Sequence, residues 1–402
     1  MINPHISNRN FFRLLLAWVL FGSLVVKGQT YTVLYSFAGT PDGAGVYGPL
    51  ALDSYGNLYG TSLNGGSGQY APGLVFKVDP SGKETILYNF TGGDDGAYPF
   101  SNLVHDAAGN LYGTTWHGGV AWAGTVFKLD PSGNESVMHS FGGPPDGDSP
   151  TDLVADDDGN LYGTTWWGGT FNDGTIFKLD SAGTETIIHN FSWEDGANPI
   201  SGLIWDSEGN LYGTTFGGGV SGYGVVFKLA TNTNTLTVLY SFTGGVDGAW
   251  PYFGHLLRDP LGNLYGTTSA GGRGCNAYGC GTVYRLDANG MLTTLYAFRD
   301  RKDGAGPTSG LVRVHGKFYG TTHSGGVTTC TDNNYPPYVT GCGTVFMLDA
   351  KGRGSVLHTF TGGEDGGNPV AGLIADSAGN LYGAASSGGA HGAGVVFKIT
   401  FP

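Results

Sequence analysis

The strongest constraint on the fold is internal repetition, because three short motifs each recur seven times in the 402 residues. The motif Gly-Asn-Leu-Tyr-Gly has its Asn at 57, 110, 160, 210, 263 and 380, and a degenerate copy, Gly-Lys-Phe-Tyr-Gly, occupies 316–320. The second motif is Gly-Thr-Val-Phe-Lys-Leu-Asp, as at 124–130. The third, Leu-Tyr-Ser-Phe, ends at Phe residues spaced 50 to 62 positions apart. A period near 50 residues is typical of proteins built from one repeated supersecondary unit.

Each repeat contains four short runs with strand character. In the second repeat they are 102–106, 110–116, 124–130 and 135–141, rich in Val, Leu, Tyr, Thr and Phe and bounded by Gly, Asp and Pro. No apolar stripe with helical spacing occurs beyond the first 28 residues. We call the four runs strands A, B, C and D and expect them to pair antiparallel.

Two turns in each repeat have recognisable chemistry. Strands A and B are joined by Asp-x-x-Gly-Asn, as at 53–57, and strands C and D by sequences such as Asp-Pro-Ser-Gly at 79–82. Asp caps a type I turn through its side chain, Pro fits the second position, and Gly adopts positive φ at little cost. We therefore expect these tight hairpins on one face of each repeat, the hairpin face. The longer B–C and D–A loops then lie on the opposite face, the loop face.

Seven four-stranded antiparallel units predict an all-β fold, a seven-bladed β-propeller. Residues 31–37 read as a strand D with no A, B or C before it, and 394–400 as a strand C with no D after it. We expect the N-terminal strand D to pair with the C-terminal strands A–C and so remove two open edges. A β-solenoid is the alternative, although hairpin-linked strands suit it poorly. The predicted repeats are approximately 31–84, 85–135, 136–185, 186–236, 237–292, 293–354 and 355–402.

The full repeat also resembles a known family. The pattern LYSFTGG-x-DGA…P…GL-x-x-D-x-x-GNLYGTT…GG…GTVFKLD resembles the GloVer tandem repeat of exported bacterial proteins, over residues 31–400. The resemblance implies a surface or secreted protein whose relatives carry various C-terminal anchors. Because no such anchor follows here, we expect release or retention in the periplasm. The family has no established activity whose residues could be carried over.

The first 28 residues predict a secretory signal peptide. Arg9 and Arg13 precede the apolar run 14–26, and small or tolerated residues follow at the cleavage positions, leaving a mature propeller of 29–402. An uncleaved anchor is the alternative, but the apolar run is short for a bilayer. The 16 basic and 32 acidic residues that remain give a net charge of −16. This charge argues against nucleic acid or anionic membrane as partners, and we expect an exported monomer.

Four cysteines in an exported chain predict two disulfides. Of the three pairings we favour Cys275–Cys280 and Cys330–Cys342, because each pair falls within one B–C loop. Zinc binding is the competing interpretation, but the spacings match no zinc pattern. The two stapled loops contain Tyr278, Tyr335 and Tyr338, and they are either recognition fingers or insertions without a ligand.

Aromatic residues gather unevenly on the expected loop face, since all seven Trp residues after the leader lie between 116 and 250. At the end of strand B, three successive repeats carry aromatics where the others have Leu63, Ser269, His323 and Ser386. Flat rings stack on the apolar faces of sugars, so a glycan or a protein is the expected ligand. Packing between Gly-rich loops is the alternative. The candidate ligand-binding residues are Trp116, His117, Trp122, Trp166, Trp167, Phe216, Trp193, Trp250 and Tyr98.

An Asp-Gly pair recurs in every D–A loop, at Asp42, Asp95, Asp146, Asp195, Asp247, Asp303 and Asp365. Seven carboxylates near one channel mouth could hold Ca²⁺, and the metal candidates in that case are Asp95, Asp146, Asp195 and Asp247. Recurrence in every repeat instead favours local turn capping. We therefore predict no cofactor.

Two functions remain open from the sequence. The first is an exported binding module that recognises a glycan or another protein on the loop face. The second is a carbohydrate-active enzyme, a polysaccharide lyase or glycoside hydrolase, that pairs Asp195 with an acid of a neighbouring blade. The regular repeats show no unique polar cluster, which favours the first, and no catalytic residue is predicted. The fold alone does not choose between them.

Overall fold

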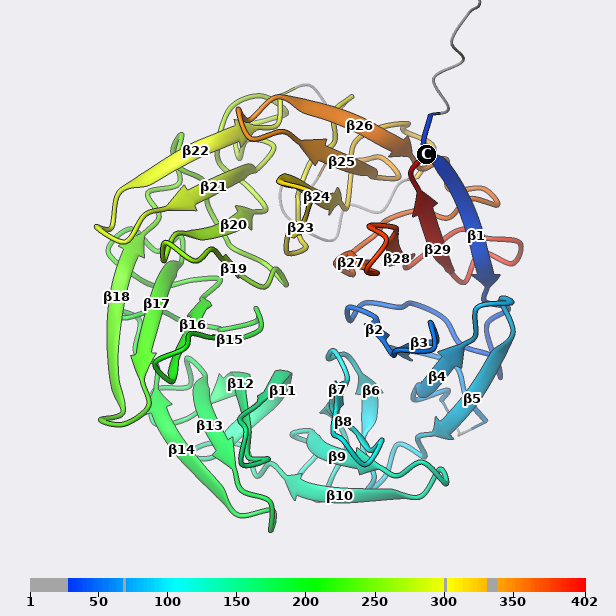
Figure 1. The fold of residues 1–402 in the computed structure, drawn as a ribbon. Coiled ribbons are helices and arrows are strands. Elements are labelled where there is room, and N and C mark those ends of the chain that lie inside the picture. Colours follow the sequence, from blue (N-terminus) through cyan, green and yellow to red (C-terminus); the bar gives the residue numbers. More distant parts are fainter. Residues whose placement is uncertain (1–27, 68–69, 300–301, 331–338) are drawn as a thin grey trace, which may run out of the picture.

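The computed structural model describes residues 28–67, 70–299, 302–330 and 339–402 (Figure 1). The predicted signal peptide, except for Gly28, lies outside the described residues, as do Tyr335 and Tyr338. All regular elements in the described part of the chain are strands. None of the described residues belongs to a helix of the length and apolarity that crossing a membrane requires.

The strands form seven antiparallel sheets around a central axis, which confirms the predicted seven-bladed β-propeller (Figure 1). Strands are given from the axis outward: blade 1 has β2 (Ala51–Leu52), β3 (Leu58–Ser62), β4 (Leu74–Val78) and β5 (Glu84–Asn89), and blade 2 has β7 (Val104–His105), β8 (Leu111–His117), β9 (Thr125–Leu129) and β10 (Glu135–Ser140), with β6 (Ala97–Pro99) also on β8. Blade 3 has β11 (Gly147–Ala155), β12 (Leu161–Gly168), β13 (Thr175–Leu179) and β14 (Glu185–Asn190); blade 4 has β15 (Ile204–Trp205), β16 (Asn210–Thr214), β17 (Val225–Ala230) and β18 (Thr235–Ser241); and blade 5 has β19 (Leu257–Arg258), β20 (Leu264–Thr268), β21 (Thr282–Leu286) and β22 (Leu292–Ala297). Blade 6 has β23 (Val312–Val314), β24 (Lys317–Thr322), β25 (Thr344–Leu348) and β26 (Gly354–Thr359), and blade 7 has β27 (Ile374–Ala375), β28 (Leu381–Ala385), β29 (Val395–Thr400) and β1 (Thr30–Ser36).

The ring closes as the sequence predicted. Strand β1 pairs antiparallel with β29, from Thr30 opposite Thr400 to Ser36 opposite Val395. Figure 1 shows the first strand beside the last one, as the outer strand of blade 7. Because these two strands come from opposite ends of the chain, their hydrogen bonds hold the whole disc closed.

Aromatic rings fill the seams between blades and explain two of the three motifs. The Phe that follows each outer strand packs on the strand C aromatic of the next blade, as Phe90 does on Phe127 at a centroid distance of 5.2 Å. All seven of these Phe residues are fully buried. Gly113 of the Leu-Tyr-Gly motif leaves room for this ring, since a Cβ there would lie 2.7 Å from the Phe127 ring. Burial of such rings contributes about 2–3 kcal/mol each.

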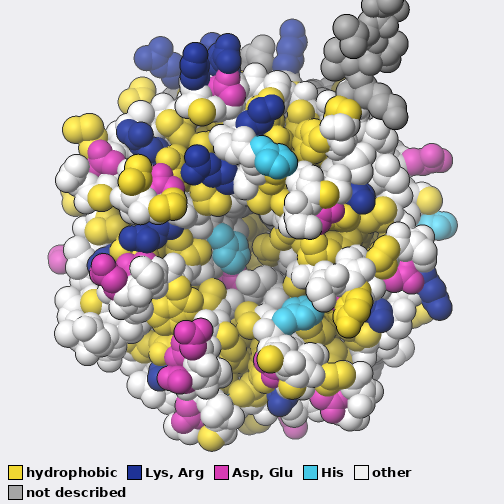
Figure 2. Space-filling view, in the orientation of Figure 1, with side chains coloured by type: hydrophobic (Ala, Val, Ile, Leu, Met, Phe, Trp, Pro, Cys, Tyr) yellow, Lys and Arg dark blue, Asp and Glu magenta, His cyan; other side chains and the backbone are white. Residues whose placement is uncertain are grey.

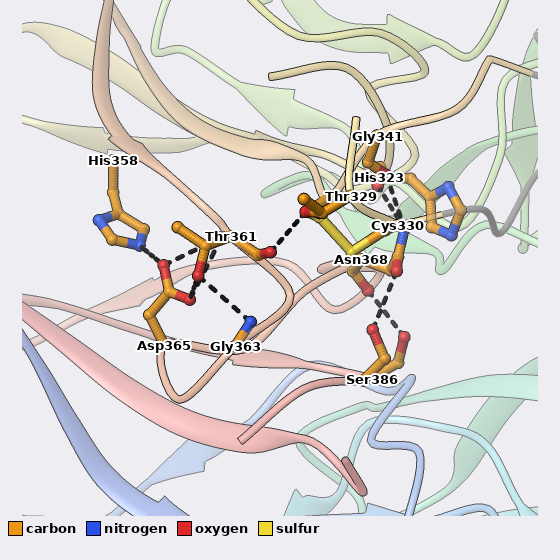
Figure 3. Close-up of a disulfide and its surroundings, with 12 residues drawn as sticks. His323, Thr329, Cys330, Gly341, His358, Thr361, Gly363, Asp365, Asn368 and Ser386 are labelled. Carbon is orange, nitrogen blue, oxygen red and sulfur yellow. Dashed lines mark hydrogen bonds and ion pairs between the residues drawn. A yellow bond between two sulfur atoms is a disulfide. The ribbon is translucent and has the colours of Figure 1, made fainter. Parts of the chain in front are cut away.

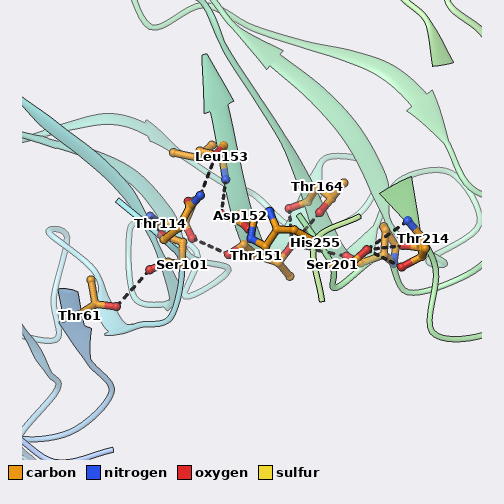
Figure 4. A network of polar contacts seen from close by, with 12 residues as sticks. Thr61, Ser101, Thr114, Thr151, Asp152, Leu153, Thr164, Ser201, Thr214 and His255 are labelled. Atoms are coloured by element: carbon orange, nitrogen blue, oxygen red, sulfur yellow. Dashed lines mark hydrogen bonds and ion pairs between the residues drawn. The ribbon is translucent and has the colours of Figure 1, made fainter. Parts of the chain in front are cut away.

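Hydroxyl groups link the inner strands of neighbouring blades. Thr61 donates to the Ser101 carbonyl at 3.2 Å, and Thr114 donates to the Pro150 carbonyl at 3.3 Å. Figure 4 shows the corresponding pairs in the next two blades, where Thr151 shares a hydrogen bond with Thr164 at 2.7 Å and Ser201 shares one with Thr214 at 2.6 Å. The threonines that follow the Leu-Tyr-Gly motif therefore join blades as well as filling strands.

The hairpin turns have the predicted geometry. The Asp53 carboxylate accepts from the backbone N–H of Tyr55 at 2.9 Å and of Asn57 at 2.8 Å, and Gly56 has φ of 84°. In the equivalent turn of blade 4, the N–H groups and side chain of Asn210 outweigh partial burial and lower the pKa of Asp206 to about 2. The A–B and C–D hairpins thus share one face, which leaves the longer loops on the other.

Both predicted disulfides are present, Cys275–Cys280 in blade 5 and Cys330–Cys342 in blade 6. Figure 3 shows the second one against the D–A loop of blade 7. Beside it, Thr329 donates to the Thr361 carbonyl at 2.6 Å, and the Asn368 amide donates to the carbonyls of His323 and Gly341 at 3.1 Å each. The second staple therefore holds two neighbouring blades together on the loop face.

Candidate ligand-binding surface

The loop face carries a continuous row of aromatic rings over blades 2 to 5. Ring centroids lie 4.9 Å apart for Phe100 and Trp116, 6.5 Å for Trp116 and Trp166, 5.8 Å for Trp166 and Phe216, and 6.0 Å for Phe216 and Trp250. We call these five residues the aromatic arc. Four of them are half-buried and Phe100 is buried. The arc brings together four of the residues selected from the sequence.

A second group of rings extends the arc on blade 2. The His117 ring is nearly parallel to those of Trp116 and Trp122, at 6.0 and 6.2 Å, and Tyr98 meets it edge-on at 6.0 Å. Burial lowers the pKa of His117 below its ordinary value, although the Asp148 carboxylate opposes this effect. A neutral imidazole is therefore favoured between the rings. Trp122 is 54% exposed, so this extension presents a broad apolar surface to solvent.

Two of the predicted residues lie at the margins. Trp167 contacts Trp166 at 5.9 Å and is 42% exposed. Trp193 is 56% exposed and covers Gly217 and Gly222 of the next B–C loop. Among the described ring contacts, Trp193 has none with the arc.

Sequence reasoning missed Phe100 of the arc and two rings beside it. Tyr252 lies 5.3 Å from Phe216 and Phe253 lies 4.9 Å from Phe100. Tyr278, which the sequence placed in a stapled loop that could act as a recognition finger, reaches Trp250 at 5.8 Å. The signal was available, because Phe100 and Tyr252 both directly follow the Pro of a D–A loop, a position that the repeat alignment identifies.

Four of these aromatics adopt a backbone conformation that bulky residues rarely have. Tyr98 and Trp250 have φ of 58° and 57°, Trp122 has φ of 63°, and Phe253 has φ of 45°. The left-handed region costs a non-Gly residue about 1–2 kcal/mol. The residues equivalent to Tyr98 and Trp250 in the other blades, also at positive φ, are Gly45, Ser149, Asn198, Gly306 and Asn368; those equivalent to Trp122 in blades 3 and 4 are Asn172 and Gly222.

The repeat has a better residue for this position. Asn198 donates from its side chain to the Trp166 carbonyl at 3.0 Å, and Asn368 donates in the same way to the His323 carbonyl. Trp250 lacks the Asn side chain that donates this hydrogen bond, and its ring stacks on that of Phe216 instead. Local stability therefore does not account for an aromatic side chain there.

The Asp-Gly residues lie at the rim of the disc rather than around the channel mouth, and their contacts are those of the turn capping that the sequence favoured. Each turn folds back on the outermost strand, where a Tyr or His of that strand meets the carboxylate. Tyr88 donates to Asp95 at 2.9 Å and Tyr240 donates to Asp247 at 3.1 Å. The backbone N–H of Thr91 also donates to Asp95, at 2.7 Å. Each carboxylate therefore caps its own turn and lies far from the channel axis, where a Ca²⁺ ion shared by several blades would have to bind.

Asp195, the acid considered for catalysis, is held as a carboxylate. It accepts from the Ser192 N–H at 2.8 Å and lies 3.0 Å from Nε2 of His189. Burial opposes ionisation, but these two partners outweigh it and lower the pKa of Asp195. A lowered pKa is the opposite of what a general acid needs near neutral pH.

One unique polar cluster, which the sequence reasoning did not foresee, lies at the central channel. Nε2 of His255 in blade 5 is 2.7 Å from Oδ2 of Asp152 in blade 3 (Figure 4). Gly202 of the intervening blade makes room, since a Cβ there would lie 2.2 Å from the imidazole. Burial opposes the charge on His255, but Asp152 outweighs it and raises the pKa of His255.

The pair adjoins a cavity of about 250 Å³ whose lining includes Asn102, His255, Gly310 and Gly372. Figure 2 shows the disc hollowed at its centre. The sequence contains a signal for this cluster. Asp152 and His255 each directly precede the recurring Leu of strand A, a position that holds Gly, Pro or Asn in the other repeats.

A comparison with protein families gives a match over residues 19–164 and 149–334 to the Gloeobacter/Verrucomicrobia repeat. The chain belongs to this family. The match confirms the resemblance drawn from the repeat motif. No curated protein sequence matches the chain.

Solved structures match the chain at low sequence identity, and one with a TM-score above 0.5 shares its fold. The extracellular domain assigned to a one-component system, BT4673 of B. thetaiotaomicron, is 15% identical with a TM-score of 0.55, covering 93% of this chain and 42% of that one. This chain thus spans about two fifths of that structure. The gluconolactonase XC5397 of Xanthomonas campestris has a TM-score of 0.44 at 14% identity, with 75% and 88% coverage. A luciferin-regenerating enzyme has 0.47 at 14% identity, with 80% and 96% coverage. The similarity to BT4673 concerns the fold alone.

Proposed function

We propose that this protein is an exported binding module that recognises a glycan through the aromatic arc and its extension on blade 2. The observation that carries the proposal is the left-handed backbone of Tyr98, Trp122 and Trp250. At these positions the repeat otherwise uses mostly Gly or Asn. A ring that is held there at a conformational cost, and that joins the arc, is better explained by ligand contact than by packing.

The arrangement suits a chain of sugars. The four partly exposed rings of the arc lie 5.8 to 6.5 Å apart over four blades, so more than one sugar face can contact them. The half-buried rings have fixed orientations, which reduces the entropy lost on binding. Export is supported by the two disulfides, which persist in oxidising compartments.

The test separates ligand binding from packing. Trp250→Asn introduces the residue that two other blades carry, and we expect the free energy of unfolding to change by less than about 1 kcal/mol, because the lost ring contacts and the gained hydrogen bond offset each other. Affinity for the best glycan on an array should fall at least tenfold.

Trp205→Ala provides the matched control. Trp205 donates to the Ala155 carbonyl at 2.9 Å and packs on Tyr162, away from the arc. This variant should lose stability and keep its affinity. Loss of stability in Trp250→Asn with unchanged glycan binding would refute the proposal, and new reducing ends during incubation would replace the binding module by an enzyme.

A further inference from the structure

The rim of the disc repeats one polar arrangement seven times. In every blade interface, a Tyr or His of the outer strand faces the Asp of the following Asp-Gly turn. Six of these pairs are hydrogen-bonded at 2.6 to 3.1 Å. The seventh pair, His139 and Asp146, is open, with Nε2 and Oδ2 3.8 Å apart.

A third position faces each pair from the next blade, on its outer strand opposite the last Leu, Val or Ile of strand C. In blade 3 this position holds Glu185, opposite Leu179. The equivalents in the other blades are Glu84, Glu135, Leu236, Leu292, Gly354 and Tyr31. A histidine therefore meets a glutamate at one interface of the seven, between blades 2 and 3.

At that interface three ligand atoms converge. One atom each from His139, Asp146 and Glu185 lies within 4.8 Å of the others. His139 Nε2 and Glu185 Oε1 are inaccessible to water and have no hydrogen-bond partner in the described structure. Glu84 and Glu135 carry the same unpartnered Oε1 at their own interfaces, so the feature specific to this interface is the unpartnered Nε2 of His139 beside it. Two buried polar atoms without partners are costly, and one cation bound between them would satisfy both.

We propose that His139, Asp146 and Glu185 bind a divalent transition-metal ion of the Zn²⁺ type at the rim between blades 2 and 3. An imidazole nitrogen with two carboxylate oxygens is a common set for such ions, whereas an all-oxygen set favours Ca²⁺ or Mg²⁺. Zinc bonds of about 2.0–2.1 Å to each atom require ligand separations of roughly 3.3 Å. The open His139–Asp146 pair is already near this value.

The supporting contacts hold the first two ligands in place. The Gly142 N–H donates to Oδ2 of Asp146 and the Gly147 N–H donates to Oδ1, both at 2.7 Å. The His139 ring packs edge-on against the buried Phe141 at 4.7 Å. Glu185, whose side chain has three rotatable bonds, has the most freedom to adjust and close the site.

The repeat provides matched variants for the test. His139→Tyr introduces the residue that four other interfaces carry, and Glu185→Leu introduces the residue of two others, so both variants should fold. His189→Tyr alters a His–Asp pair that faces Leu236 and serves as the control. Each protein, freed of metal by a chelator and dialysed, is titrated with ZnCl₂ by calorimetry, with circular dichroism to verify folding.

We expect one Zn²⁺ per chain in the wild type and in His189→Tyr. The dissociation constant should rise at least tenfold in His139→Tyr and in Glu185→Leu. The thermal midpoint of the wild type should rise with Zn²⁺, and that of the two site variants should not. Absence of stoichiometric binding in the wild type, or equal affinity in folded His139→Tyr, would overturn the proposal.

Discussion

Replacing Glu84 by Gln should stabilise the protein at pH 8 and leave its stability unchanged at pH 4.5. Burial and then the negative charge of Asp42 raise the pKa of Glu84 from its ordinary 4.5 to about 7. Its Oε1 is buried without a hydrogen-bond partner in the described structure. The folded protein therefore keeps a proton that the unfolded chain releases above pH 4.5. Stability falls as the pH rises from 4.5 to about 7 and then stays constant with respect to this group.

The magnitude follows from the same values. A change from 4.5 to about 7 corresponds to about 3.4 kcal/mol, and because the residue is only partly buried, solvent screening reduces this to about 1–1.5 kcal/mol. Urea unfolding at pH 4.5, 6 and 8 measures the difference, with the exposed Glu208→Gln as control. If Glu84→Gln has the same effect at pH 4.5 and at pH 8, the reasoning on burial is refuted.

The remaining predictions concern closure of the ring and its axis. Deleting residues 29–37 removes β1 and exposes the edge of β29, so the truncated chain should unfold without cooperativity; a sharp thermal transition at the wild-type midpoint would show that closure is unnecessary. Asp152→Asn should cost about 1–3 kcal/mol at pH 6, because it leaves the largely buried His255 without its counter-charge. Since the pKa of His255 is raised, the ion pair is fully present below about pH 6.5 and is lost at higher pH, and a loss of stability as large at pH 9 as at pH 6 would contradict this assignment.

The fold was predictable because the motifs that define one blade occur seven times in the sequence. Each turn carries its own chemistry, as in Asp53 and Gly56, and the half-blades at the two ends match. The disulfide pairing was also predictable, because each pair closes a short loop. The strands and hairpin turns that the repeat determines are local, so the sequence of a single unit is enough to predict them.

The site was only partly predictable, because it depends on how blades face one another. Trp116, Trp166 and Phe216 occupy one repeat position and could be grouped by alignment. The meeting of Asp152 with His255 across a whole blade depends on the curvature of the ring, which no motif encodes. The alternative of a calcium ring at the channel mouth depended on the same geometry, and the turn folds outward onto strand D rather than inward to the channel.

The central claim is that departures from the repeat serve binding, while the repeat itself serves stability. The most direct measurement restores the repeat at three departures at once, with Tyr98→Gly, Trp122→Gly and Trp250→Asn, and determines the free energy of unfolding and the glycan affinity of that single protein. We predict stability within about 2 kcal/mol of the wild type, because the strain relieved at the left-handed positions offsets the lost ring contacts, together with at least a hundredfold weaker binding. A protein that loses most of its stability and still binds the glycan as the wild type does would contradict the claim.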